Sequence, residues 1–141
     1  MRTVRCSDTL TTPAGEQRAH LPLPDTGSLR GDLTAWAASA AADLARPEGR
    51  LFLLALVTSI PSTPEAQAER DQHLQRRIRA IRQVTDRAAG RGESPPDPGT
   101  IADAVLGPLH RRALWDTLPA DPAYASSLVD RLLSPASLDV Q

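Results

Sequence analysis

Apolar residues recur at intervals of three and four along most of the chain, from about residue 28 onward. This spacing is typical of helices with one buried face. It predicts five helices, over about residues 28–45, 47–60, 64–89, 98–115 and 122–133. No segment alternates apolar and polar residues with a period of two, so no strand is expected. The sequence therefore predicts an all-α fold that forms a single helical bundle.

Three of these helices are expected to begin where an oxygen-bearing residue precedes a proline. Proline suits the first helical turn because its φ is already fixed and its missing N–H has no partner there. The preceding side-chain oxygen can accept a backbone N–H as a cap. The three pairs are Thr63-Pro64, Asp97-Pro98 and Asp121-Pro122.

Two segments have unusual apolar patterns. The helix expected over residues 47–60 is apolar on nearly every side, which predicts burial at the centre of the bundle. Pro108 lies inside the fourth expected helix and cannot donate a hydrogen bond to the carbonyl of Ala104. We therefore expect a kink or break near Gly107.

Charge and cysteine content exclude several classes of protein. All 16 basic residues are arginine, and with 17 acidic residues the formal net charge is −1. Nucleic-acid binding depends on basic clusters. The only basic run, residues 70–87, is interrupted by acids and has no interleaved aromatic residue, so we interpret it as a solvated helix face. The single cysteine, Cys6, excludes an internal disulfide and a cysteine-based metal motif.

Targeting and membrane signals are not visible in the sequence. No signal-peptide pattern opens the chain. The longest apolar run, residues 51–57, is far shorter than the roughly 20 residues that cross a bilayer. We expect a cytoplasmic protein with no membrane partner.

Catalytic and metal-binding motifs are also missing from the sequence. There is no Gly-x-Ser-x-Gly elbow and no glycine-rich phosphate loop. Glu69 and His73 are four residues apart, as two metal ligands on one helix face would be, but no third ligand accompanies them. We interpret them as a solvated pair. The sequence predicts no enzyme, no catalytic residue, no metal and no cofactor.

Four stretches resemble the C-terminal effector-binding domain of TetR-family transcriptional regulators. They are DTGSLRGDL (residues 25–33), the helix pair around Leu54 and residues 74–89, LGPLHRRAL (residues 106–114) and SLVDRLL (residues 127–133). The resemblance extends over about residues 21–135. It departs from the family pattern after LGPL, where His110, Arg111 and Arg112 stand at positions that are often aromatic.

The resemblance implies that the last two helices pack against those of a second copy as a four-helix interface. The residues expected there are Val105, Leu109, Arg112, Tyr124, Leu128 and Leu132. It also implies a pocket between helices for a small effector. The candidate lining residues are Trp36, Phe52, Leu56, Leu74, Ile78, Ile81 and His110. Trp36 is also interpretable as ordinary core, and His110 as a partly exposed histidine on a polar edge.

The domain organisation follows from the same comparison. Residues 1–24 are expected to be irregular and too few for a helix-turn-helix head. Residues 25–135 form the expected domain, and residues 136–141 a tail.

With only 3% aromatic residues, the pocket is expected to be aliphatic and to bind an apolar, poorly charged ligand. The sequence thus predicts an effector-sensing, dimerising domain without its DNA-binding head. The alternative is a free-standing helical protein that pairs with a full-length regulator or with itself.

Overall fold

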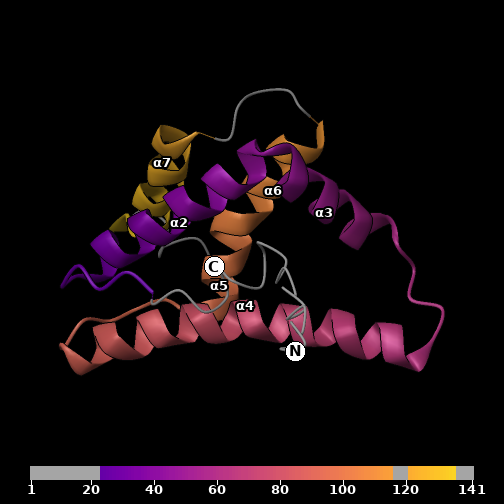
Figure 1. Ribbon diagram of the computed structural model, residues 1–141. Coiled ribbons are helices and arrows are strands. Elements are labelled where there is room, and N and C mark those ends of the chain that lie inside the picture. Colours follow the sequence, from indigo (N-terminus) through magenta and orange to yellow (C-terminus); the bar gives the residue numbers. More distant parts are fainter. Residues whose placement is uncertain (1–22, 116–120, 136–141) are drawn as a thin grey trace, which may run out of the picture.

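The computed structural model describes residues 23–115 and 121–135. Nearly all of the predicted N-terminal segment and the whole predicted tail lie outside these residues. All regular structure in the described residues is helical, so the all-α prediction is confirmed. Figure 1 shows one long helix along the lower edge, with the other helices arranged above it.

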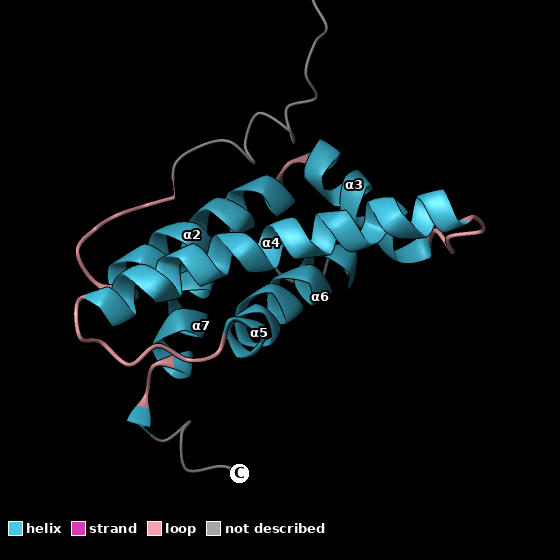
Figure 2. Ribbon diagram, turned by 90° about the horizontal axis from the view of Figure 1, so that it is seen from below, coloured by secondary structure: helices cyan, strands magenta, loops and turns pink. Residues whose placement is uncertain are grey.

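The five predicted helices are present, and the fourth is divided by a π-helical turn. The elements are α2 (Leu29–Ala45), α3 (Pro47–Thr58), α4 (Pro64–Gly90), α5 (Pro98–Ile101), η1 (Ala102–Leu106, π-helical), α6 (Gly107–Trp115) and α7 (Pro122–Leu132). The side chains of Thr63, Asp97 and Asp121 each accept a backbone N–H at the helix start, as predicted. Seen from below, α4 crosses in front of the other helices (Figure 2).

The break predicted at Pro108 is the π-helical turn. The N–H of Gly107 donates to the carbonyl of Ala102, five residues earlier. Because Pro108 has no N–H for a standard helical bond, the turn before it widens by one residue. The widened turn keeps the apolar positions on both sides of it directed inward, and Val105 and Leu109 are fully buried.

The core forms around α2. One stripe of this helix is buried along its whole length, with Leu33, Ala37 and Ala41 fully inaccessible. Alanine adds little bulk, so the helices beside Ala37 and Ala41 can approach closely. The remaining core comes from α4, α5 to α6 and α7, through Ile81, Val84, Ala88, Ile101, Val105, Leu109, Ala125, Leu128 and Val129.

A buried carboxylate holds the start of α2. Asp32 is fully buried, and its Oδ1 accepts the backbone N–H of Thr26 at 2.6 Å and the Thr26 hydroxyl at 2.9 Å. Its other oxygen lies 3.3 Å from a guanidinium nitrogen of Arg91. Burial alone would raise the pKa of Asp32, but the hydrogen bonds from Thr26 and Arg91 outweigh it and lower that pKa. Asp32 is therefore ionised and fully paired.

The same network ties α2 to the end of α4. Arg91 follows α4 directly and also pairs with Glu93 at 3.0 Å. Both carboxylate oxygens of Glu93 accept the first N–H of α2, from Leu29, at 3.1 Å. The DTGSLRGD stretch is thus a structural element that fixes how two distant helices meet.

Gly49 is expected to be intolerant of a side chain. A Cβ at this position would lie 2.0 Å from the carbonyl oxygen of Asp43, so the joint between α2 and α3 would have to shift. Gly49→Ala should lower the free energy of unfolding by about 1–3 kcal/mol, measured by urea denaturation. Gly90→Ala is the matched control, because its Cβ would meet nothing within 4 Å. Equal stability of the two variants would contradict the close approach.

The prediction that the second helix is buried was wrong. Only Leu53 of α3 is buried, whereas Leu51 is 65% exposed and Ile60, just beyond the helix, is 89% exposed. Helix α3 packs mainly on α2 and α6, so most of its other apolar residues are incompletely covered. Leu74 of α4, one of the candidate pocket residues, is also exposed.

Candidate effector site and dimer surface

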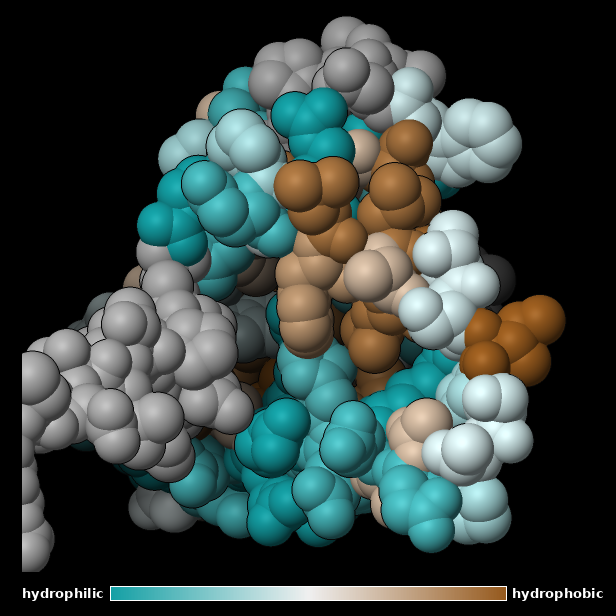
Figure 3. Space-filling model, turned by 45° about the vertical axis from the view of Figure 1, so that its right-hand side comes forward, coloured by the Kyte–Doolittle hydropathy of each residue, from teal (hydrophilic) through white to brown (hydrophobic). Residues whose placement is uncertain are grey.

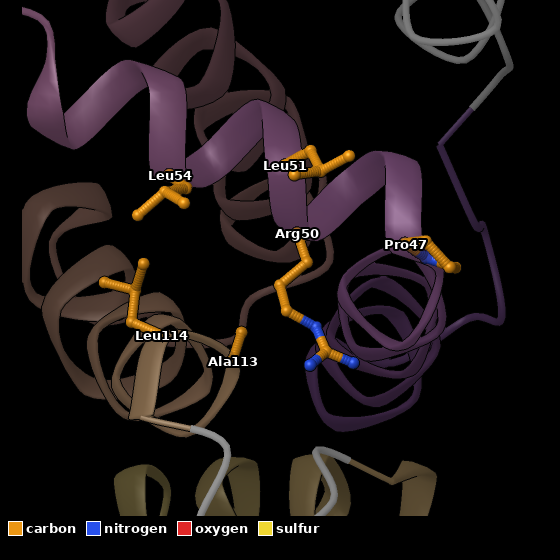
Figure 4. Close-up of a pocket in the computed structure, with 6 residues that line it drawn as sticks. All are labelled: Pro47, Arg50, Leu51, Leu54, Ala113 and Leu114. Carbon is orange, nitrogen blue, oxygen red and sulfur yellow. The ribbon is translucent and has the colours of Figure 1, made fainter.

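An open apolar groove lies between α3 and the end of α6. It has a volume of about 410 Å³ and is lined by Pro47, Arg50, Leu51, Leu54, Ala113 and Leu114. Figure 4 shows Leu54 and Leu114 pointing toward one another across it, with the side chain of Arg50 extending from α3. A groove of this size lies within the range of small-molecule sites, roughly 300–1,000 Å³.

Exposed apolar side chains extend beyond the groove. Leu51, Phe52, Leu54 and Val57 of α3 are each about half exposed or more. Figure 3 shows hydrophobic residues gathered on this face, with hydrophilic residues below them. A contiguous exposed apolar patch marks a surface that binds a ligand or another protein.

A polar cluster joins α3, α4 and α6. The Nε of Arg77 donates to Nε2 of His73 at 3.4 Å, both on α4. The His73 ring meets Phe52 of α3 edge-on, with ring centroids 5.2 Å apart. Burial, reinforced by the charge of Arg77 and by His73, lowers the pKa of His110 on α6 to about 4. The three polar side chains are each partly buried, so none is sealed from solvent.

The groove and the polar cluster adjoin. His110 precedes Ala113 and Leu114 by three and four residues on α6, so these side chains share one helix face. One helical turn, about 5.4 Å, therefore separates His110 from the groove. The lining of the groove itself is apolar apart from Arg50.

The predicted pocket residues do not line this groove. Trp36 packs against the core, and Ile81 is part of it. Leu56 and Ile78 are partly buried, and Leu74 is exposed on α4. Phe52 and His110 belong to the adjoining polar cluster. The sequence carries one signal for the groove residues Leu51 and Leu54. Helix α3 is apolar on nearly every side, and two neighbouring helices cannot cover all of these residues.

The predicted dimer residues separate into two groups. Val105 and Leu109 are fully buried and Leu128 is 4% exposed, so they pack in the core of their own protomer and leave no surface for a second copy. Arg112 and Tyr124 lie nearer the surface, with the guanidinium 3.2 Å from the ring centroid. Leu132 is partly buried against the core.

His110 should make stability depend on pH. Its folded pKa of about 4 lies below the ordinary 6.5, so the unfolded chain binds more protons between these values. The contribution of His110 to the free energy of unfolding is therefore complete above pH 6.5. It falls as the pH decreases toward the folded-state pKa of about 4. The groups acting on His110 are His73 and Arg77 of α4, and Asp43 of α2 acts on Arg77.

This dependence can be measured by urea unfolding. Allowing for partial exposure, we expect the free energy of unfolding to fall by about 1–2 kcal/mol between pH 7 and pH 5 through this group. His110→Asn removes the titration and should flatten the profile by that amount. Parallel profiles for the two proteins would contradict the assignment.

Metal and membrane features are not found in the described part of the chain. No group of three or more His, Cys, Asp and Glu side chains there could hold a metal ion. None of the described helices is both long and apolar enough to cross a bilayer.

The described residues form an all-helical domain with an open apolar groove on its surface. A family model described as tetracyclin repressor-like, C-terminal domain, matches residues 23–132. The chain therefore belongs to the TetR-like family through this C-terminal domain. No curated protein and no solved structure matched the chain significantly.

Proposed function

We propose that residues 23–132 are the effector-sensing and dimerisation part of a TetR-like transcriptional regulator that works in the cytoplasm. In this proposal a helix-turn-helix head outside these residues binds DNA. The family match supports the regulatory role. The observation that carries the sensing role is the apolar groove between α3 and α6, beside partly buried polar side chains. A small, mainly apolar ligand suits such a groove because its burial removes exposed leucine surface from water.

The second copy is proposed to pack on the outward faces of α6 and α7. Of the residues expected from the sequence, Arg112 and Tyr124 lie nearest this surface, and Leu132 lies at its inner edge against the core. Trp115, 73% exposed at the end of α6, and Ser127 on α7 extend it. Exposed aromatic residues with an arginine are typical of the residues that dominate binding at interfaces.

Ligand binding in the groove can be tested with Nile red, a neutral apolar dye whose fluorescence rises in an apolar site. Leu54→Glu should weaken dye binding at least tenfold, about 1.4 kcal/mol, because it places a charge in the groove. Leu74→Glu is the matched control, since Leu54 and Leu74 are 47% and 48% exposed but only Leu54 lines the groove. Equal losses, or no dye binding by the unmodified chain, would contradict the proposal.

A further inference from the structure

A buried apolar stripe runs along α5, η1 and α6 and ends at the groove. Its members recur at every fourth position and are all buried: Ile101, Val105, Leu109 and Ala113. In a regular α-helix, three steps of four residues would rotate such a stripe by about 120°. The π-helical turn takes up one extra residue and so removes about 100° of this rotation. The stripe therefore stays on one face of the segment as far as Ala113.

The stripe becomes smaller where it reaches the groove. Its first three members have large side chains that pack in the core, whereas Ala113 has only a methyl group. Ala113 is also one of the residues that line the groove, and it is the buried one among them. A large side chain at this position would continue the close packing of the stripe. Alanine instead leaves the space open, so Ala113 forms the floor of the groove.

The walls of the groove stand around this floor and are more exposed. Leu51, Leu54 and Leu114 are all exposed, and Figure 4 shows Leu54 and Leu114 pointing toward one another from α3 and α6. An apolar group that enters between these walls loses more of its contact with water the closer it comes to Ala113. Since the free energy gained scales with the apolar area removed from water, the depth of the floor controls the affinity.

We propose that Ala113 determines which ligands the groove accepts, because its small side chain leaves room for an apolar group between α3 and α6. The inference rests on the proposed sensing function and deepens it. The groove selects a neutral apolar ligand by the size of the group that fits above Ala113. The π-helical turn contributes by holding Ala113 on the face that α3 covers.

Filling the floor tests this role. Ala113→Leu adds an isopropyl group in the space above the floor, and leucine is nearly as favourable as alanine in a helix. Nile red binding, measured by fluorescence titration, should weaken at least about tenfold because the dye can no longer reach the floor. The midpoint of urea unfolding should stay the same or rise, because the added side chain buries apolar surface in open space.

Ala55→Leu is the matched control for this substitution. It makes the same chemical change on α3, but Ala55 is exposed and does not line the groove. Its dye affinity should stay within about twofold of that of the unmodified chain, since the space above Ala113 is unchanged. The comparison separates filling of the groove from a general increase in apolar surface.

Two results would overturn the inference. A loss of dye affinity in Ala113→Leu no larger than that in Ala55→Leu would mean that the floor does not limit the ligand. A lower urea midpoint, or failure to fold, in Ala113→Leu would mean that the space above Ala113 is already filled.

Leu54→Glu separates the inference from the function beneath it. Dye binding that is weakened by Leu54→Glu but not by Ala113→Leu would retain the sensing function and reject the role of Ala113. Failure of the unmodified chain to bind the dye would reject both.

Discussion

Asp32→Ala is expected to lower the free energy of unfolding by about 2–3 kcal/mol, because it removes a buried carboxylate that accepts several hydrogen bonds. The carboxylate accepts two hydrogen bonds from Thr26 and one from Arg91. Its removal leaves the N–H of Thr26 without its acceptor and deprives Arg91 of one partner. The start of α2 and the end of α4 would then lose the link between them.

Urea denaturation measures this loss, and an exposed acid provides the control. Asp130 on α7 pairs with Arg30 on α2, but both side chains are more than half exposed. Asp130→Ala should therefore change stability by less than about 1 kcal/mol. A double-mutant cycle of Asp32→Ala with Arg91→Ala should show coupling between the two residues. Losses of similar size at Asp32 and Asp130 would contradict the structural role of the DTGSLRGD stretch.

Ser127→Arg is expected to weaken the proposed dimer at least a hundredfold, about 2.7 kcal/mol. Ser127 lies on the face of α7 opposite the buried residues Ala125 and Leu128, and it is only partly exposed. In a two-fold symmetric interface the same helix face meets its counterpart, so each substitution acts twice. A long charged side chain there would have to be desolvated against the second copy.

Sedimentation equilibrium over a range of concentrations measures the dissociation constant. Ser39→Arg is the matched control, because Ser39 is exposed on α2, away from the proposed surface. It should leave the dissociation constant unchanged. A dimer that tolerates Ser127→Arg as well as Ser39→Arg would place the interface elsewhere.

Helix positions could be predicted because their signals are local. A capping oxygen followed by proline starts α4, α5 and α7 where expected, and each cap forms its hydrogen bond. The break before Pro108 was equally predictable, since a missing N–H disrupts any helix in the same way. How these helices pack against one another depends on residues far apart in the sequence, so it could not be predicted from local signals.

The exposure of α3 shows why helix packing could not be predicted from the apolar pattern alone. A run that is apolar on all sides is compatible with central burial or with an incompletely covered helix, and periodicity does not distinguish them. The pairing of Phe52 with His73 likewise depends on how α3 and α4 converge, twenty-one residues apart in sequence. The cluster of His73, Arg77 and His110 was unpredictable for that reason.

The resemblance itself identifies the fold better than the ligand. Its most distinctive stretch, DTGSLRGD, forms hydrogen bonds that hold α2 on α4. The groove residues Leu51 and Leu54 are aliphatic positions that many helices share. Family membership therefore identifies the architecture rather than the ligand.

Native mass spectrometry of the unmodified chain with Nile red tests most directly whether this domain assembles as a dimer that binds a ligand. We expect an assembly of twice the 15.1 kDa of one chain, with dye bound to it. A species with the mass of one chain and no dye at micromolar concentration would contradict it.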